Sequence, residues 1–321
     1  MIHLRLVVPK DISGDVRALM CESDAVSSVI HLEDAAAKPE GDVILCDVAR
    51  EDASVIIGDL KEMGLHERGT ISVEEVDSAL STAAREAEKA AAGLPSDAVV
   101  WEEVEARTSE QTELGASFLA FMALATMIAG VGVIIDSQVL IIGAMVVGPE
   151  FGPIAGFCVA VVHRRGHLAR RSILALAAGF PVAITAAFLL TLAVRGIGAA
   201  PDELTERPLT DFISHPDEFS VIVALLAGVA GVLSLTSAKS GALIGVLISV
   251  TTIPAAGNIG VAAAYGDGDE WVGAMEQLSL NLASILVAGI ATLYIQRRLY
   301  LRRRREHLRD PIREAAGLPR R

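Results

Sequence analysis

Cysteine is scarce in this sequence, and the few cysteines follow no pattern that holds a metal or forms a disulfide framework. There are three, Cys21, Cys46 and Cys158, which is typical of a reducing cytoplasm. The sequence also lacks a Gly-rich phosphate-binding loop and any convergent nucleophile, base or pair of carboxylates. His163 and His167 share a helical spacing, but they stand in a basic loop. We therefore expect no enzyme activity, no cofactor and no metal.

Basic residues are few in the first third of the chain, which is strongly acidic. Residues 1–113 hold 25 of the 40 Asp and Glu residues but 10 of the 27 Lys and Arg residues. This balance predicts an acidic soluble domain ahead of a more basic membrane domain, and it argues against nucleic acid as a partner. A signal peptide is not evident either, because residues 1–6 alternate between apolar and polar side chains and form no long apolar run.

Long apolar segments fill the remainder of the chain. The mean hydropathy is +0.49 and 52% of the residues are hydrophobic, and a helix of about 20 apolar residues can cross the ~30 Å hydrocarbon core of a lipid bilayer. The sequence therefore predicts an α-helical polytopic membrane domain of six spans over residues 114–296. The spans are expected at residues 115–135, 138–162, 172–195, 219–238, 241–264 and 273–296.

The charges between the spans predict their orientation, since Lys and Arg are enriched on the cytoplasmic side. The basic stretches at residues 163–171 and 302–305 would lie in the cytoplasm, whereas the acidic loops at residues 202–206 and 266–270 would face outward. Both termini are then cytoplasmic. The arginines at 302–305 can also touch anionic lipid, although their effect on topology alone accounts for them.

The first 77 residues alternate between short strand-like and helix-like patterns. Their order, β-α-β-β-α-β, is typical of a ferredoxin-like α+β domain. We expect this cytosolic domain to be either a ligand sensor or a passive soluble module. A helical linker would follow over residues 78–113, in which Trp101 either lies near the bilayer surface or packs the linker. A basic cytosolic tail would occupy residues 297–321.

The second span carries the feature on which the functional interpretation depends. Two Gly-Pro pairs, Gly148-Pro149 and Gly152-Pro153, enclose Glu150 inside an apolar run. Proline interrupts helical hydrogen bonding, and peptide groups freed at membrane depth need protein or water as partners. A kinked packing helix is one interpretation. Glu150 favours the other, a functional break, because an ionisable group within the membrane is costly.

A weak internal repeat predicts a second break of the same kind. The pattern of residues 118–156 recurs over residues 219–257, with Pro254 at the position of Pro153. Because three spans separate the copies, the second must run oppositely through the bilayer, as in the 3+3 inverted repeat of many transporters. Chance similarity between Gly- and Ala-rich spans is the alternative. Half-helices restarting after these prolines would attract an anion, whereas Glu150 favours a proton or cation, so the charge of the passenger stays open.

Polar and helix-breaking residues therefore form a candidate pathway for a substrate or ion. Asn258 directly follows the second break. Glu276 and Asn281 lie along the sixth span, and Asn281 is deep enough to need a partner, either a neighbouring helix or a ligand. The full set is Gly143, Met145, Gly148, Pro149, Glu150, Gly152, Pro153, Pro254, Gly257, Asn258, Glu276 and Asn281.

Several motifs of this chain resemble those of a known family. They are Trp101-Glu102-Glu103-Val104, residues 132–137 at the end of the first span, Ile142-Gly143-Ala144-Met145 with its two Gly-Pro pairs, and Ser279-x-Asn281. Over residues 97–296 the chain resembles the bacterial membrane family known as domain-of-unknown-function family 389. The resemblance implies a multi-pass protein of the bacterial inner (plasma) membrane and no particular substrate. Two departures from the family pattern, Glu150-Phe151 for an apolar pair and Ile253-Pro254 for a double proline, make Glu150 a feature of this protein.

Two functions are compatible with this sequence. The first is a membrane transporter or channel-like permease for a small solute or ion, regulated by the cytosolic domain. The second is a non-transporting sensor or scaffold, in which the cytosolic domain binds a ligand or partner and the membrane domain only anchors and oligomerises it. Six spans with costly breaks exceed what an anchor requires, so we favour transport. We also expect a homo-oligomer, taken to be a dimer.

Overall fold

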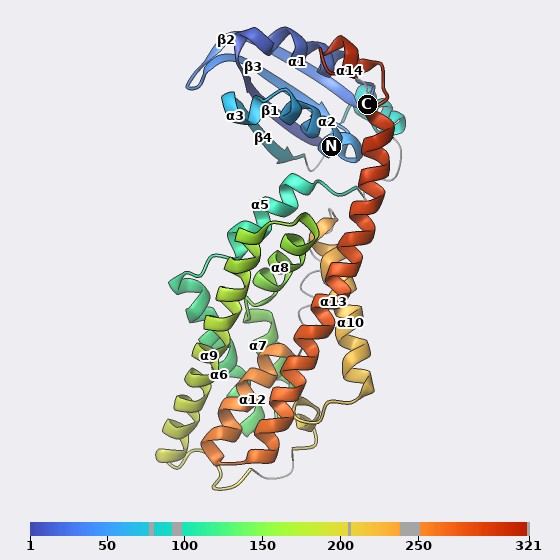
Figure 1. The fold of residues 1–321 in the computed structure, drawn as a ribbon. Coiled ribbons are helices and arrows are strands. Elements are labelled where there is room, and N and C mark those ends of the chain that lie inside the picture. Colours follow the sequence, from blue (N-terminus) through green and yellow to red (C-terminus); the bar gives the residue numbers. More distant parts are fainter. Residues whose placement is uncertain (77–79, 92–97, 205–206, 238–250, 320–321) are drawn as a thin grey trace. The chain divides into compact units, whose positions relative to one another are not determined.

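The computed structural model describes residues 1–76, 80–91, 98–204, 207–237 and 251–319. They form two compact units, whose elements are labelled in Figure 1. The sheet unit comprises Met1–Val104, Thr236–Ala238 and Gln296–Arg321, and the membrane unit comprises Glu105–Leu235 and Lys239–Ile295. The sheet unit thus includes residues of the expected linker and of the expected basic tail.

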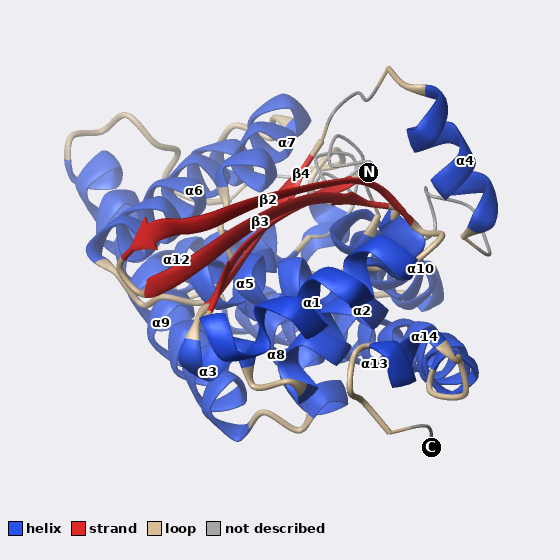
Figure 2. Ribbon diagram, turned by 90° about the horizontal axis from the view of Figure 1, so that it is seen from above, coloured by secondary structure: helices blue, strands red, loops and turns tan. Residues whose placement is uncertain are grey.

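Alternating apolar residues build a four-stranded antiparallel sheet, drawn in red in Figure 2. In β1 (Ile2–Val8) every second side chain is buried, because successive side chains of a strand point to opposite faces. The strands stand in the order β2 (Val26–Ala37), β3 (Glu40–Val48), β1 and β4 (Thr70–Glu75). The element order is the predicted β-α-β-β-α-β, with α1 (Lys10–Glu22), α2 (Arg50–Glu62) and an additional one-turn helix, α3 (Leu65–Arg68), before β4.

Both longer helices cover the same face of this sheet. Leu19 of α1 and Ile56 and Leu60 of α2 share one apolar core with Leu4 and Leu6 of β1, and all of them are buried. Burial of this apolar surface is the main term that stabilises the unit.

Segments from the linker and the C-terminal part of the chain complete the sheet unit. Helix α4 (Thr82–Ala90) and the start of α5 (Trp101–Gln111), both in the expected linker, belong to this unit. Trp101 is buried against Tyr300 with ring centroids 6.2 Å apart. Trp101 therefore packs within the unit. Tyr300 belongs to the last part of α13 (Gly268–His307), and a short helix, α14 (Ile312–Ala315), follows.

A fully buried carboxylate, Asp59 of α2, binds these C-terminal residues. His307 Nε2 lies 2.7 Å from Asp59 Oδ2, and Arg304 Nη1 lies 2.6 Å from Asp59 Oδ1. Arg313, also fully buried, pairs with Asp59 as well. The expected basic tail is thus part of the folded sheet unit.

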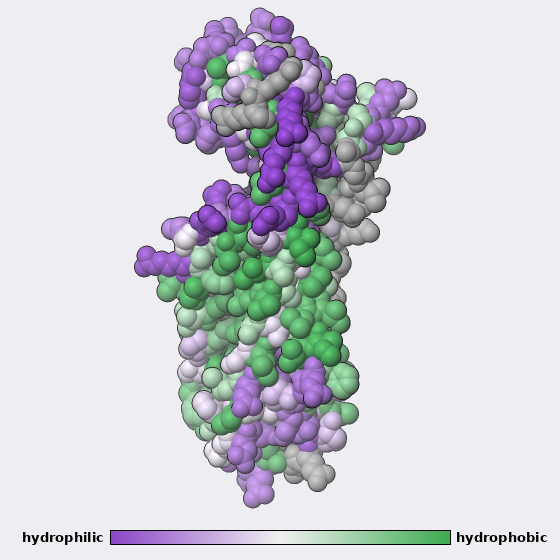
Figure 3. All heavy atoms as spheres, turned by 45° about the vertical axis from the view of Figure 1, so that its right-hand side comes forward, coloured by the Kyte–Doolittle hydropathy of each residue, from purple (hydrophilic) through white to green (hydrophobic). Residues whose placement is uncertain are grey.

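The membrane unit consists of apolar helices, and the face shown in Figure 3 is largely hydrophobic. Among the described residues, four helices are long and apolar enough to cross a bilayer: α6 (Ala116–Ile134), α9 (Gly166–Gly196), α10 (Glu218–Thr236) and α13. The pair α7 (Gln138–Val147) and α8 (Phe151–His163), bent by 51°, forms a fifth, broken candidate.

The predicted fifth span, residues 241–264, lies partly outside the described residues. Only its second half is described, as α12 (Thr252–Tyr265). The count of six spans and the inverted repeat therefore stay predictions.

Small residues let α12 approach its neighbours closely. A Cβ atom on Gly257 would stand 2.9 Å from the Cβ of Ala129 in α6, and one on Gly260 would stand 2.7 Å from the carbonyl oxygen of Ile184 in α9. Close approach through small residues is typical of helices packed within a membrane. Gly257 therefore serves the packing of α12 against α6.

The connections that follow α6, α9 and α12 gather at one end of the membrane unit. Asp136, after α6, accepts a hydrogen bond of 2.8 Å from Thr210 Oγ1, and Tyr265, at the end of α12, donates one of 2.8 Å to the carbonyl oxygen of Pro201. The short 3-10 helix η2 (Asp211–Ile213) lies in the same connection as Thr210. These connections include residues 202–204 and 266–270 of the two acidic loops that were predicted to face outward, whereas residues 205–206 lie outside the described residues. The side of the membrane on which these connections lie stays a prediction.

Candidate functional site

Two short helices of the membrane unit begin in the same way. α8 opens with Phe151-Gly152-Pro153 and α12 with Thr252-Ile253-Pro254, so each has a proline as its third residue. Proline is tolerated in the first helical turn because the amide hydrogen that it lacks would have no partner there. The helices therefore begin before the prolines, and the expectation that they restart after Pro153 and Pro254 is wrong in this detail.

The starts of these two helices meet in the interior of the unit. Thr252 Oγ1 donates a hydrogen bond of 2.8 Å to Glu150 Oε1, and Glu150 is only 3% exposed. Gly148 makes room for this contact, since a Cβ atom at its position would stand 2.6 Å from Ile253 Cγ1 and would also collide with the Glu150 carboxyl group. The bend between α7 and α8 thus faces the start of α12. Whether a second break precedes α12 stays a prediction, because residues 238–250 lie outside the described residues.

α8 and α12 run from this meeting point toward opposite ends of the unit, as Figure 1 shows. α9 links the two ends. It begins directly after α8, where His163 lies 3.3 Å from Glu105, and Arg195 in its last turn donates to the carbonyl oxygen of Ala264, near the end of α12, at 2.6 Å. The two short helices therefore point away from each other.

Glu150 has one satisfied and one unsatisfied carboxyl oxygen. Oε1 accepts the Thr252 hydroxyl, whereas Oε2 is buried without a hydrogen-bond partner among the described residues. The starts of two helices, each equivalent to a partial positive charge of about half an electron, lie at this carboxyl group. The Glu150 carboxyl group therefore occupies the position at which two helix N-termini would attract an anion.

A second polar group adjoins this contact at Thr251, the residue before α12. Gln277 Nε2 and Asn281 Nδ2, one turn apart on α13, donate to Thr251 Oγ1 at 3.0 and 2.7 Å. Both amide side chains are buried, so Asn281 has the partner that its depth requires. Thr251, Gln277 and Asn281 also line a pocket of about 440 Å³, together with Met145.

Asn258, which is buried, bridges a partly buried ion pair near the end where the connections gather. Its Oδ1 accepts from Arg207 Nη1 at 3.2 Å, and its Nδ2 donates to Glu270 Oε2 at 3.1 Å. Arg207 Nη2 lies 2.7 Å from the same carboxylate oxygen. This network ties α12 to the start of α13 and to the connection before η2.

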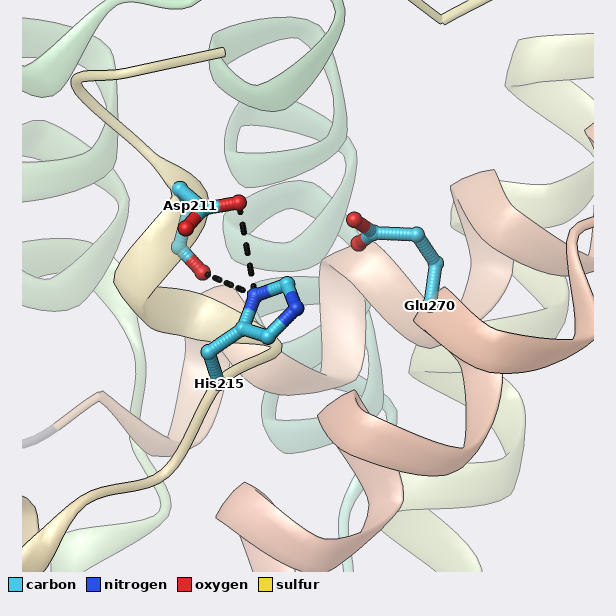
Figure 4. A group of neighbouring side chains, drawn as sticks. All are labelled: Asp211, His215 and Glu270. Carbon is cyan, nitrogen blue, oxygen red and sulfur yellow. Dashed lines mark hydrogen bonds and ion pairs between the residues drawn. The ribbon is translucent and has the colours of Figure 1, made fainter. Parts of the chain in front are cut away.

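Glu270 also belongs to a group with the chemistry of metal ligands (Figure 4). Asp211, His215 and Glu270 offer ligand atoms that lie within 4.8 Å of one another, and His215 Nδ1 lies 3.3 Å from Asp211 Oδ1. Asp211 and His215 are exposed, however, and the Arg207 guanidinium already pairs with Glu270. Because like charges repel, this group is a poor site for a metal ion.

The sheet unit brings a serine, a histidine and an aspartate together, but not as a catalytic triad. Ser13 Oγ donates directly to Asp42 Oδ2 at 2.5 Å, and His31 Nε2 lies 3.0 Å from the same oxygen. In a triad the histidine takes the serine proton, and the carboxylate holds the opposite ring nitrogen. Here the carboxylate binds the serine itself, so the group orders the end of the sheet.

The predicted pathway residues lie in different parts of the structure. Those at the two helix starts are Gly148, Pro149, Glu150, Gly152, Pro153 and Pro254. A Cβ atom on Gly152 would stand 2.8 Å from Gln111 Cβ, which makes Gly152 a packing position. Gly143 and Glu276 are exposed, whereas Glu150 and Thr252 are buried.

Sequence reasoning missed Thr251, Thr252, Arg207 and Glu270, and it noted Gln277 only as a neighbour of Asn281. The two threonines carried a signal, because Thr shortly before a proline is typical of a helix start. Arg207 carried none, since it stands beside acidic residues in a loop that was interpreted only through its net charge.

Comparison with known proteins supports the resemblance inferred from the motifs. The sequence profile of the family described as Domain of unknown function (DUF389) matches residues 145–287. An uncharacterized protein of Methanocaldococcus jannaschii is 26% identical over 192 residues, which cover 60% of this chain and 58% of that relative. The chain therefore spans less than two thirds of this relative's length. No solved structure matches. Residues 145–287, which include both helix starts, thus match the profile of the DUF389 family, to which the motifs also pointed.

Proposed function

We propose that the membrane unit is a transporter or channel-like permease for a small cation or uncharged solute. The observation that carries this proposal is the hydrogen bond between Thr252 and Glu150, which joins the starts of two short, oppositely directed helices. Discontinuous helices of this kind form substrate and ion sites near the bilayer midplane of many transporters. A membrane anchor needs no buried acid at such a place.

The position of Glu150 supports a passenger that is not an anion. Two helix starts attract negative charge, but the Glu150 carboxyl group already occupies this place. Its Oε2 atom, which lacks a hydrogen-bond partner among the described residues, can hold a proton or contact a cation or a hydrogen-bond donor. The proposal therefore assigns to Glu150 the coupling of transport to protons.

The remaining parts of the molecule take the roles expected from the sequence. In this proposal the membrane unit has six spans in a 3+3 inverted repeat, and the matching starts of α8 and α12 support the repeat. The sheet unit is a ferredoxin-like regulatory domain, and both termini lie on the cytoplasmic side of a bacterial plasma membrane. The expected assembly is a homo-oligomer, taken to be a dimer.

Proteoliposomes test the proposal directly. Purified full-length protein is reconstituted in vesicles with a trapped pH-sensitive dye, and a panel of monovalent cations, small amines, alcohols and sugars is added outside. We expect at least one solute to change the internal pH only in vesicles that contain the protein. No protein-dependent flux of any solute in the panel would overturn the transport function.

The variant Glu150→Gln tests the role of the carboxyl group. Glutamine keeps the shape of the side chain and can still accept the Thr252 hydroxyl, but it does not titrate. We expect the pH dependence of the flux to disappear while expression and Tm stay close to wild type. Glu203→Gln, at an exposed acid in a loop, is the matched control and should keep the wild-type pH profile. An unchanged profile in Glu150→Gln would leave Glu150 with a structural role only.

A further inference from the structure

A pocket of about 440 Å³ adjoins the Glu150–Thr252 contact. Its walls come from α7, η2, α10 and α13, with Thr251 from the start of α12. Small-molecule sites are typically pockets of this size, with apolar walls and a few convergent polar groups. The apolar lining includes Ile141, Ile142, Met145, Phe212, Val223 and Ala224.

One part of the lining is polar, and one of its residues, Gln277, has a buried acceptor atom without a partner among the described residues. Gln277 is 2% exposed, and its amide nitrogen donates to Thr251 Oγ1, as that of Asn281 does. The carbonyl oxygen of Gln277, Oε1, is buried without a hydrogen-bond partner in the part of the chain that the structure describes. A buried acceptor without a donor is costly, so a ligand that brings a donor to this oxygen is favoured.

The charge of the lining selects the kind of donor. Asp217 is the one charged residue that lines the pocket among the described residues. A carboxylate or phosphate would therefore find no cation among the described lining residues. An ammonium or hydroxyl group, in contrast, can donate to Gln277 Oε1, and an ammonium is also attracted by Asp217.

We infer that this pocket binds a small primary amine or alcohol with an apolar body, whose head group donates a hydrogen bond to Gln277 Oε1. The inference rests on the proposed transport function only in taking the bound molecule as the passenger. Thr251 of the pocket is followed directly by Thr252, which binds Glu150, so a molecule bound in the pocket would lie near the Glu150 carboxyl group. Binding itself requires no transport.

Three probes that share one apolar body test the inference. They are 2-phenylethylamine, 2-phenylethanol and phenylacetate, which differ in the head group. Binding to full-length protein in detergent is measured by isothermal titration calorimetry and by the shift in Tm, with protein-free micelles as the blank. We expect saturable binding of the amine and the alcohol and none of phenylacetate. Phenylacetate bound as tightly as the amine would overturn the inference.

Two variants locate the bound probe. Gln277→Leu removes the acceptor at nearly constant volume and should weaken amine binding about tenfold, the usual effect of losing one buried hydrogen bond. Ile142→Trp fills the pocket with a larger side chain. Because Ile142 is 43% exposed, we expect this variant to fold, so it tests the site even if Gln277→Leu unfolds. Ser279→Ala, at an exposed position of α13, is the control and should bind as wild type. Unchanged binding in Ile142→Trp would overturn the pocket as the site.

The binding and flux measurements separate this inference from the proposed function. Amine binding that is lost in Ile142→Trp, in a protein that moves no solute, would uphold the pocket and overturn the transport function. Solute flux in a protein that binds none of the three probes would uphold transport and overturn the pocket.

Discussion

Gly148 and Ile253 lie so close together that one added carbon would force them apart. A Cβ atom at position 148 would stand 2.6 Å from Ile253 Cγ1, whereas non-bonded carbons pack at about 3.5–4.0 Å. We expect Gly148→Ala to separate the starts of α8 and α12 and to destabilise the membrane unit by roughly 1–3 kcal/mol, as overpacking typically does. Thermal unfolding in detergent and the flux assay measure the effect.

Gly143 supplies the matched control for this substitution. It lies in the same short helix, α7, but a Cβ atom at its position would meet nothing within 4 Å. Gly143→Ala should therefore leave Tm and flux near the wild-type values, or raise Tm slightly through the better helix propensity of alanine. Equal losses of Tm and flux in the two variants would show that the contact with Ile253 is not the reason why position 148 needs glycine.

Asp59→Asn should destabilise the sheet unit strongly. The substitution removes the carboxylate that pairs with Arg304, His307 and the fully buried Arg313, and it leaves Arg313 its pair with Glu62. Breaking a buried ion pair by removing one partner costs roughly 3–5 kcal/mol. Limited proteolysis and the thermal unfolding of the purified protein report the loss. Asp11→Asn removes the exposed pair with Arg68 and should shift the unfolding midpoint far less. A similar small shift for both variants would contradict the role of the Asp59 network.

The pH dependence of stability in the sheet unit should include a contribution from Asp42. The Ser13 hydroxyl, the backbone amide of Asp34 and the His31 ring hold the pKa of Asp42 at about 2, below its ordinary value of 3.8. Because the folded state lowers this pKa, the stabilisation is complete above the ordinary value and is lost as the pH falls toward about 2.

The variant Asp42→Asn isolates this contribution from those of other groups. The difference in Tm between wild type and Asp42→Asn should be constant above about pH 5 and should shrink steadily as the pH falls from about 4 to about 2. Thermal unfolding of both proteins across this range provides the measurement. A difference that grows on acidification would show that the sign of the linkage is wrong.

Cys21 should report the orientation of the protein in the membrane. It is exposed, whereas Cys46 and Cys158 are buried, and burial, with a smaller effect of the Asp47 charge, raises the pKa of the Cys46 thiol to about 12. Since maleimides react with the thiolate, an impermeant maleimide should label Cys21 alone. With a cytoplasmic sheet unit, we expect labelling in inside-out vesicles and none in intact cells. Cys21→Ser should abolish the signal, and labelling of intact cells would reverse the predicted topology.

Local sequence patterns predicted the local features of this molecule. The alternation in residues 1–77 gave the order of strands and helices, because the side-chain period of a strand is visible in the sequence. The Gly-Pro pairs around Glu150 located the bend between α7 and α8, because proline acts on the turn in which it stands. Neither prediction required knowledge of the tertiary structure.

The contacts that define the candidate site were beyond such patterns. Thr252 and Glu150 are 102 positions apart, and no pattern in either segment predicts that it contacts the other. Arg304 was interpreted through its charge alone, as a marker of topology or a contact to lipid, yet it binds Asp59 and the carbonyl oxygen of Val55. Charge predicts that a residue will find a counter-charge or water, but not which counter-charge.

The Asp59 network has a consequence for how the polypeptide matures. Asp59 leaves the ribosome early, while its partners Arg304, His307 and Arg313 are translated only at the end of α13, the last of the candidate spans among the described residues, and after it. A fragment that ends at residue 95 would keep the carboxylate without its counter-charges, and it would need residues 296–321 as a separate peptide to refold. The domain that is synthesised first is thus the one that is completed last.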